Sequence, residues 1–418
     1  MNVEKPGQDE TAFWRHLSRH VAAGGVVASH TLQHLYGEGF YVILPAIYTS
    51  LGLTPIAAGF IGTVRQICSG VASMLGGFMI DRLQHRRTLI LYLSLTIMGL
   101  GYLLVGVSPT YLLIVLSVGL AGAAGSLWHP AAISLLSQQY PERRGFMMGL
   151  HRSTGNAGDT LGPLIVGALL LVMAWQNILF GAFPVALILA FLLWVVLHWA
   201  GGWQERAGGT AAKRRLGEQF GALKKLLKSR ELILLLLVSG ISGLGQGSLM
   251  LWLPMYLQEA QGMGSLGIGM HLGLLSSVGI ASGPLLGILS DRVGRKGVIF
   301  IVLMAQVIIA TLMALVGGGL MLTILVGFMG AFLFALNPLV QAGALDLAEG
   351  KNLEGSMIGL LWGNNAAFGG LSPVLVGFLI TSLGYGVLFW YIAAMSAVAG
   401  IFALFLLFTR GQPQIVAI

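Results

Sequence analysis

The chain contains 418 residues, of which 56% are hydrophobic and only 9% are charged. Soluble domains carry about 25% charged residues, so this composition excludes an ordinary water-soluble enzyme, a disordered chain and a small disulfide-stabilised domain. The single cysteine, Cys68, excludes an internal disulfide and a zinc site built from several cysteines. The sequence therefore predicts an integral membrane protein.

The net charge of +8 follows from where the basic residues lie, and does not indicate a nucleic-acid partner. Lys and Arg cluster between pairs of apolar stretches, at 82–87, 143–144, 206–230 and 292–296. The intervening turns contain none. Basic turns face the cytoplasm, so the pattern predicts a multi-pass protein of the bacterial inner membrane with both termini in the cytoplasm.

The apolar stretches predict twelve transmembrane helices, since each is long enough to span a bilayer. The first six are expected at 20–50, 54–81, 86–107, 109–138, 143–173 and 177–199. The last six are expected at 231–259, 264–292, 296–317, 319–349, 354–383 and 386–409.

One long hydrophilic stretch separates the two sets of helices. It gives an N-terminal six-helix bundle (1–199), a cytoplasmic linker (200–230) and a C-terminal six-helix bundle (231–418). Within the linker, apolar residues recur at helical spacing among lysines from Leu216 to Leu227. This pattern predicts an amphipathic helix on the membrane surface, and a solvated linker is the alternative.

An internal repeat relates the two sets. Gly77 and Asp81 of the sequence GFMIDR match Gly287 and Asp291 of GILSDR at an offset of 210 residues. The same offset relates further pairs of glycines and prolines, namely Gly145 and Gly355, Gly149 and Gly359, Pro163 and Pro373, and Gly167 and Gly377. Two homologous halves predict a transporter whose substrate site lies near the membrane midplane between them.

These two motifs resemble the signature that follows helix 2 in the major facilitator superfamily. The first copy keeps Gly77, Asp81, Arg82, Arg86 and Arg87, with Gln84 in place of the usual glycine. The second copy is complete and includes Gly287, Asp291, Arg292, Arg295 and Lys296. The resemblance implies an all-α integral membrane fold of twelve helices in two pseudo-symmetric bundles. The motif residues would then form a conformational latch, in which the Asp meets neighbouring Arg side chains and a helix N-terminus.

The predicted fifth helix resembles that of drug/proton antiporters in the same superfamily. Its spacing is carried by Gly149, Gly158, Gly162, Pro163 and Gly167. The stretches SHTLQHL, SLWHPAAISLL and HRSTGNAGDTLGPL further resemble the fosmidomycin-resistance branch. The resemblance implies proton-coupled antiport, although close helix packing alone is also a sufficient role for the glycines.

Charged side chains inside a membrane are costly and are functional candidates by default. His30, His34 and Glu38 share one face of the first helix, and Asp159 lies in the fifth. We expect Glu38 or Asp159 to carry the proton, because burial favours the neutral form of a carboxyl group, with His30 and His34 as relay. Structural Glu–Arg or Asp–Arg pairs are the alternative.

Further polar and aromatic residues in the predicted spans are candidates for substrate binding. They are Arg65, Trp128, His129, Arg152, Asn156, Gln246, Trp252, Asn337, Gln341, Trp362 and Asn364. Every central charge falls in the first half, whereas the second offers mainly amides. The first half is therefore expected to couple protons and the second to shape the pocket.

The leading hypothesis is a monomeric, proton-coupled secondary transporter that exports a small amphiphilic organic compound. Proton-coupled uptake of an organic anion, bound by Arg65 and Arg152, is the alternative. Transport of a transition metal or a metal chelate, bound by the helix-1 histidines and carboxylates, is a third hypothesis. No nucleotide-binding loop of the GxxxxGK[ST] type is present, and neither an enzymatic activity nor a cofactor is expected.

Overall fold

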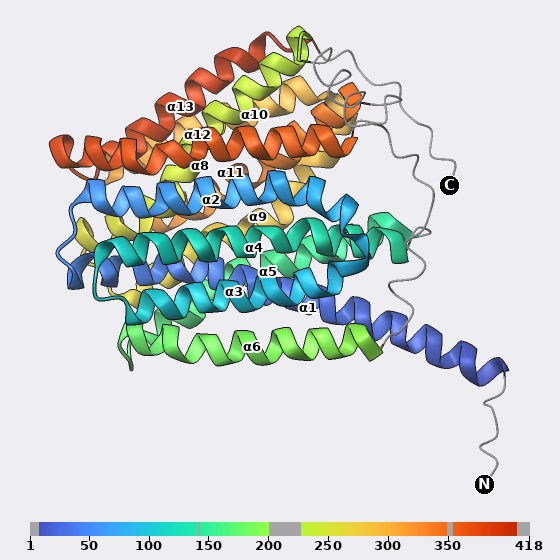
Figure 1. The fold of residues 1–418 in the computed structure, drawn as a ribbon. Helices are drawn as coiled ribbons and strands as arrows, with labels where there is room; N and C mark the ends of the chain where they lie inside the picture. The colour runs from blue at the N-terminus through green and yellow to red at the C-terminus, as the bar shows by residue number, and fades with distance from the viewer. Residues whose placement is uncertain (1–7, 141–142, 200–226, 349–353, 408–418) are drawn as a thin grey trace.

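The computed structural model describes residues 8–140, 143–199, 227–348 and 354–407. Within these ranges the chain forms long α-helices and one short 3-10 helix, with no strand (Figure 1). The first set is α1 (Gln8–Ser50), α2 (Pro55–Arg82), η1 (Gln84–Arg86), α3 (Arg87–Val107), α4 (Tyr111–Gln139), α5 (Arg144–Leu169) and α6 (Trp175–Trp199). The second set is α8 (Arg230–Glu259), α9 (Ser265–Val293), α10 (Arg295–Val316), α11 (Gly319–Ala348), α12 (Glu354–Leu383) and α13 (Val387–Leu404).

The helix boundaries follow the predicted ones within a few residues in most places. Helix α1 starts well before the predicted residue 20, because the polar N-terminal segment continues the helix beyond the apolar stretch. Helices α5 and α13 end four and five residues early, at Leu169 and Leu404. The amphipathic surface helix predicted in the linker falls almost wholly on 200–226, outside the described residues.

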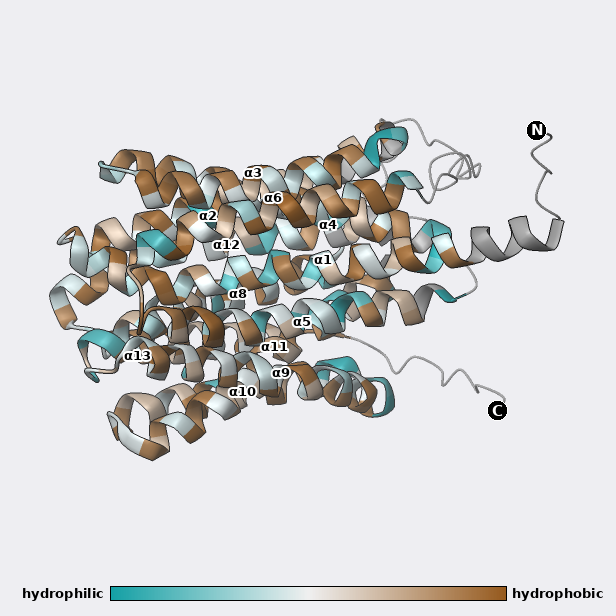
Figure 2. Cartoon of the chain, turned by 90° about the horizontal axis from the view of Figure 1, so that it is seen from below, coloured by the Kyte–Doolittle hydropathy of each residue, from teal (hydrophilic) through white to brown (hydrophobic). Residues whose placement is uncertain are grey.

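Nine of the described helices are long and apolar enough to cross a membrane by length and composition. Hydrophobic residues run along most of the length of α6, for example (Figure 2). The other three, α1, α2 and α5, have 43, 28 and 26 residues but a lower mean hydropathy. These three helices carry the four central charges singled out above, Glu38, Arg65, Arg152 and Asp159, which lower their mean hydropathy.

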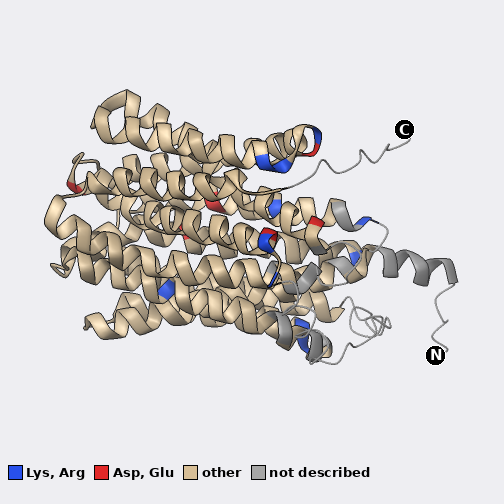
Figure 3. Ribbon diagram, turned by 90° about the horizontal axis from the view of Figure 1, so that it is seen from above, with Lys and Arg blue, Asp and Glu red and all other residues tan. Residues whose placement is uncertain are grey.

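The two ends of the bundle differ in charge. Lys and Arg of the described residues gather toward the end that holds the α2–α3, α4–α5 and α9–α10 connections, which we call the basic end (Figure 3). At the opposite end the turns rely on glycine: Gly52 and Gly262 have φ values of 56° and 64°, a region that other residues rarely adopt. Thr54 then caps α2 by accepting a hydrogen bond from the Ala57 N–H at 3.3 Å, with Pro55 as the first helical residue.

The internal repeat reappears in how the two sets of helices meet. Helix α2 packs along α12, and α5 packs along α9. A Cβ added to Gly167 of α5 would lie 2.7 Å from the Ser265 carbonyl oxygen of α9. A Cβ added to Gly377 of α12 would lie 2.6 Å from the carbonyl oxygen of Pro55 in α2. The two contacts are therefore equivalent under the repeat.

The two contacts differ in length. Along α2 and α12 the contacts continue from Gly377 as far as Gly363, which meets the side chain of Met74. Along α5 and α9 the close glycine contacts lie in the half near the opposite end, up to Gly273. Toward the basic end, Gly149 of α5 and Gly283 of α9 have nothing within 4 Å of an added Cβ. Helices α5 and α9 thus diverge toward the basic end.

Candidate functional site

Three glycines of α5 bring this helix against the polar face of α1. A Cβ on Gly158 would lie 2.7 Å from the His34 Cβ, and a Cβ on Gly162 would lie 2.6 Å from the Leu35 carbonyl oxygen. A Cβ on Gly155 would meet the His30 ring. Small residues allow such backbone approach. The glycine-rich face of α5 therefore positions the α1 histidines.

Close approach of α1 and α5 joins two of the predicted proton-coupling residues. The Nδ1 atom of His34 lies 2.5 Å from Oδ1 of Asp159. Both side chains are largely enclosed, with 17% and 11% of their surface exposed. An imidazole nitrogen and a carboxylate oxygen joined by a hydrogen bond share one proton between them.

Glu38 lies one further turn along α1 from this pair. Its Oε2 atom is buried and has no hydrogen-bond partner among the described residues. Neither Glu38 nor Asp159 forms an ion pair with Arg65 or Arg152 in the described part of the chain. The structural Glu–Arg or Asp–Arg pairs considered as an alternative are therefore not formed in this structure.

Arg65 of α2 is held by α1 instead. Its guanidinium donates to the Tyr41 hydroxyl at 2.5 Å and to the Gly37 carbonyl oxygen at 2.9 Å. It also lies 4.6 Å from the centre of the Tyr41 ring, a favourable cation–π geometry. Arg65 thus orders α1 against α2, whereas Arg152 of α5 is exposed.

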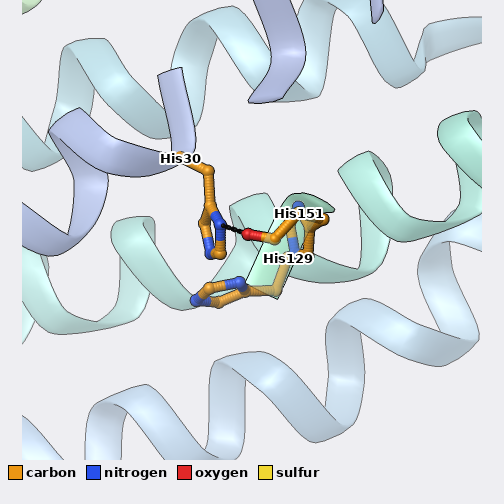
Figure 4. Close-up of side chains that lie close together, drawn as sticks. All are labelled: His30, His129 and His151. Atoms are coloured by element: carbon orange, nitrogen blue, oxygen red, sulfur yellow. Dashed lines mark hydrogen bonds between the residues drawn. The ribbon is translucent and has the colours of Figure 1, made fainter. Parts of the chain in front are cut away.

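Three histidines from three helices gather next to the His34–Asp159 pair (Figure 4). His30 of α1 stacks on His151 of α5, with ring centres 3.8 Å apart and planes at 5°. His129 of α4 stands perpendicular to both rings. Trp128 closes the cluster by stacking on His30 at 5.0 Å, and it is fully buried.

His151 was not among the predicted site residues. In the sequence it shares a helical face with Gly155 and Gly158 of α5, and a face rich in glycine indicates helix packing rather than a polar site. The structure shows that this face packs against the histidine face of α1, so a polar residue on it joins the cluster. The usable signal was the shared helical face of His151, Gly155 and Gly158.

A polar cavity of about 190 Å³ lies between α2 and the second set of helices. Gln341, Asn337 and Trp362, all predicted to bind substrate, line it. Among the described lining residues there is no Lys, Arg, Asp or Glu. The full lining is Gln66, Ser69, Gly70, Ser73, Ser239, Asn337, Val340, Gln341, Leu361, Trp362, Asn365 and Ala366.

Other predicted binding residues lie away from this cavity. Gln246 accepts a hydrogen bond from Asn337 at 3.0 Å and so supports the cavity wall. Trp252 is fully buried and donates to the Pro373 carbonyl oxygen at 3.0 Å, while Asn364 donates to the Leu236 carbonyl oxygen at 2.8 Å. These two side chains bond within the second set of helices, and Asn365 lines the cavity in place of Asn364. Asn156 is half-buried on α5.

A second, apolar cavity of about 430 Å³ lies between α1, α3, α5 and α6. Tyr36, Phe40 and Tyr102 line its aromatic side. Val166 of α5 also lines it. This cavity offers almost no polar surface, so it suits an apolar group.

The second copy of the motif forms a cluster of ion pairs at the basic end, and its role as a latch stays a prediction. Arg295 donates to Asp291 at 2.8 Å and also bonds to Asp346 of α11. It therefore joins the start of α10 to the ends of α9 and α11. In this second copy Arg292 is exposed and Gly287 is half-buried. In the first copy Arg86 is exposed and Gly77 lies in α2, while the side chains of Asp81 and Arg82 lie outside the described set.

Comparison with known proteins finds similarity along nearly the whole chain. A family model described as Major Facilitator Superfamily matches residues 26–366. "Probable sulfoacetate transporter SauU" of Cupriavidus necator is 25% identical, over 93% of this chain and 94% of that protein. "Fosmidomycin resistance protein" of Escherichia coli is 24% identical over 85% of each chain. "Multidrug resistance protein MdtG" of Enterobacter lignolyticus is 28% identical over 84% of each.

Solved structures with the same fold have much lower identity. A bacterial homologue of the human lysosomal transporter Spinster aligns with a TM-score of 0.74 and 15% identity, over 93% of this chain and 95% of that chain. The nucleoside transporter NupG aligns with a TM-score of 0.74 and 13% identity, over 92% and 99%. At this identity the likeness establishes the arrangement of helices alone.

Proposed function

Since the chain belongs to the Major Facilitator Superfamily and has its twelve-helix membrane fold, we propose that it is a proton-coupled secondary transporter. It exports a small amphiphilic organic compound across the bacterial inner membrane. The basic end faces the cytoplasm, as the positive-inside rule requires. The protein works as a monomer by alternating access.

The enclosed His34–Asp159 pair is the observation that carries the proposal. Ionisable side chains inside a membrane protein are costly to bury, so such a pair is a functional candidate by default. The proton that they share can leave for one side or the other when the surroundings change. Glu38 and His30 extend the pair in both directions along α1, each displaced by one turn, about 6 Å along the helix axis.

The helix contacts support alternating access between the two halves, 1–199 and 231–418. In this structure the halves meet closely at the opposite end, through Gly167 and Gly377. The same end is bridged by a hydrogen bond of 2.8 Å from Gln258 to Thr49. At the basic end α5 and α9 diverge. This arrangement fits a state that is closed toward the outside, with the linker 200–230 connecting the halves.

The polar cavity supports an organic substrate with polar groups. It presents amide and hydroxyl groups, and Trp362 offers a ring for stacking against an apolar part of that substrate. The apolar cavity lies among other helices and shares no lining residue with the polar one, so it is a separate space. The names of the relatives point in the same direction, since they include a fosmidomycin resistance protein and a multidrug resistance protein.

Transport into proteoliposomes tests the proposal. With an acidic interior, wild-type protein should accumulate its substrate from outside in exchange for protons; fosmidomycin is the first compound to try, followed by a panel of amphiphilic drugs. Glu38→Gln and Asp159→Asn should lose this accumulation but keep substrate counterflow. Glu259→Gln, an exposed carboxylate of α8, is the matched control. Normal accumulation in both Glu38→Gln and Asp159→Asn would show that neither residue carries the proton.

Uptake of an organic anion together with protons is the second candidate. It is favoured by the similarity to a protein named as a sulfoacetate transporter and by the exposed Arg152. Arg65 is less suitable for the anion because Tyr41 and Gly37 already hold its guanidinium. Sulfoacetate uptake driven by an acidic exterior, and lost in Arg152→Gln, would establish this function instead.

A further inference from the structure

The histidine cluster offers ligand atoms from three separate helices. One ring nitrogen each of His30, His129 and His151 lies within 4.8 Å of the other two. Around a tetrahedral ion with metal–nitrogen bonds of about 2.0–2.1 Å, neighbouring ligand nitrogens lie roughly 3.4 Å apart. The nitrogens are therefore within about 1.5 Å of the spacing that one ion requires, and the rings must also turn so that their lone pairs point at it.

Hydrogen bonds fix which nitrogen of His30 can act as a ligand. Its Nδ1 lies 2.7 Å from the His151 carbonyl oxygen (Figure 4). A carbonyl oxygen only accepts, so Nδ1 carries the hydrogen and Nε2 keeps its lone pair. That Nε2 atom is buried and has no partner among the described residues, and the same holds for Nδ1 of His151.

This arrangement is the one that metal-binding histidines adopt. A metal ligand usually donates its second ring N–H to a carbonyl oxygen or a carboxylate, which fixes the ring and its tautomer. His30 does so with a carbonyl oxygen, and His34 next to it pairs its Nδ1 with Asp159. The centres of the His30 and His34 rings are 4.5 Å apart.

We propose that His30, His129 and His151 bind one divalent transition-metal ion, with a fourth coordination position open. Three neutral imidazoles suit Zn²⁺, Co²⁺, Ni²⁺ or Cu²⁺ and disfavour Mg²⁺ or Ca²⁺. His30 and His151 stack in parallel planes, so one ring turns about its χ2 torsion to face the ion, and this torsion has a broad, soft profile. The half-buried His129 ring gives the ion its point of entry.

The bound ion would join α1, α4 and α5 at one point. Helices α1 and α5 carry the proposed proton site, so the metal and the transported proton would occupy neighbouring positions on the same face of α1. The inference goes beyond the proposed function because the binding needs neither a substrate nor a proton gradient. A protein that binds the metal but does not couple protons would support this inference and contradict the proposed function. A protein that couples protons but does not bind the metal would do the opposite.

Titration of the purified full-length protein with Co²⁺ tests the site, after removal of any polyhistidine tag. We expect one ion per chain, a visible absorption band of the strength typical of four-coordinate Co²⁺, and a rise in the thermal unfolding temperature with metal concentration. His129→Gln should lower the affinity by at least about tenfold. No hydrogen bond of the described residues depends on the His129 ring, so this variant should fold even if His30→Gln does not.

His271→Gln is the matched control. His271 is a buried histidine of α9, and its two ring nitrogens already contact Gly267 and Thr323 at 2.7 and 2.9 Å. It should bind Co²⁺ as wild type does. Unchanged affinity in a folded His129→Gln would overturn the proposal, as would a stoichiometry of zero or a Co²⁺ spectrum typical of six water or carboxylate ligands.

Discussion

The contact of Gly167 with α9 gives the sharpest mechanical prediction. An alanine Cβ at this position would lie 2.7 Å from the Ser265 carbonyl oxygen and 3.2 Å from the Gly269 Cα atom. Both neighbours are backbone atoms, so no side-chain rotation relieves the clash. Gly167→Ala therefore forces α5 away from α9 at the opposite end of the bundle.

The size of the effect follows from the cost of overpacking, about 1–3 kcal/mol. The better helix propensity of alanine contributes equally to both conformations and cancels in the equilibrium between them. The ratio of molecules open at the opposite end to molecules closed there should rise by about 5- to 150-fold. Gly149→Ala on the same helix has nothing within 4 Å and should leave this ratio unchanged.

Labelling of one buried cysteine measures the ratio. Leu251 of α8 is 1% exposed and touches Gly62 of α2 between the two halves. In a background with Cys68→Ser, Leu251→Cys should react with a water-soluble maleimide only when the opposite end opens. The rate should rise by about 5- to 150-fold in Gly167→Ala and stay constant in Gly149→Ala.

Two results would refute this reasoning. Equal labelling rates in folded Gly167→Ala and Gly149→Ala would show that the α5–α9 contact does not hold this end closed. A lower unfolding temperature for Gly167→Ala with an unchanged labelling rate would show that the glycine serves packing alone.

The remaining predictions concern single side chains. Arg65→Lys should lower the free energy of unfolding by about 1.5–3 kcal/mol, because lysine cannot reach both acceptors on α1; thermal unfolding of the purified protein measures it. Asp346→Asn should change stability by less than about 1 kcal/mol, because its partner Arg295 also bonds elsewhere and Asp346 is 48% exposed; a larger loss in denaturant titration would contradict this. Trp362→Ala should weaken substrate binding in a thermal-shift titration while the protein without substrate unfolds at the wild-type temperature. Trp252→Phe should lower that unfolding temperature and leave substrate binding unchanged.

The helices and the family were predictable from the sequence because apolar length and repeated motifs need no knowledge of packing. The predicted resemblance to the superfamily is confirmed by the family model and by the fosmidomycin-resistance relative. The starts of α2 and α9, Pro55 and Ser265, lie 210 residues apart, as the repeat requires. The first helix was predicted at 20–50, and its earlier start at Gln8 was missed because the N-terminal turns are polar.

Side-chain partners were less predictable, because they depend on how far each helix is rotated against its neighbours. His34 and Asp159 were both identified, but their direct contact depends on the glycines of α5. Trp252 resembled a cavity residue because it lies near polar positions, whereas the rotation of α8 turns it into the core. Arg65 was expected to pair with a carboxylate, but its acceptors are the Tyr41 hydroxyl and the Gly37 carbonyl oxygen. Neither acceptor is charged, so the sequence gives no indication of this pairing.

The direction of proton movement tests the central claim most directly. Wild-type proteoliposomes in weakly buffered medium, without any imposed gradient, receive on the outside the compound that stabilises the purified protein most in a thermal-shift screen. Antiport predicts that the external medium acidifies as substrate enters and protons leave, and that Asp159→Asn abolishes the change. Alkalinisation of the medium would contradict antiport and establish proton-coupled uptake.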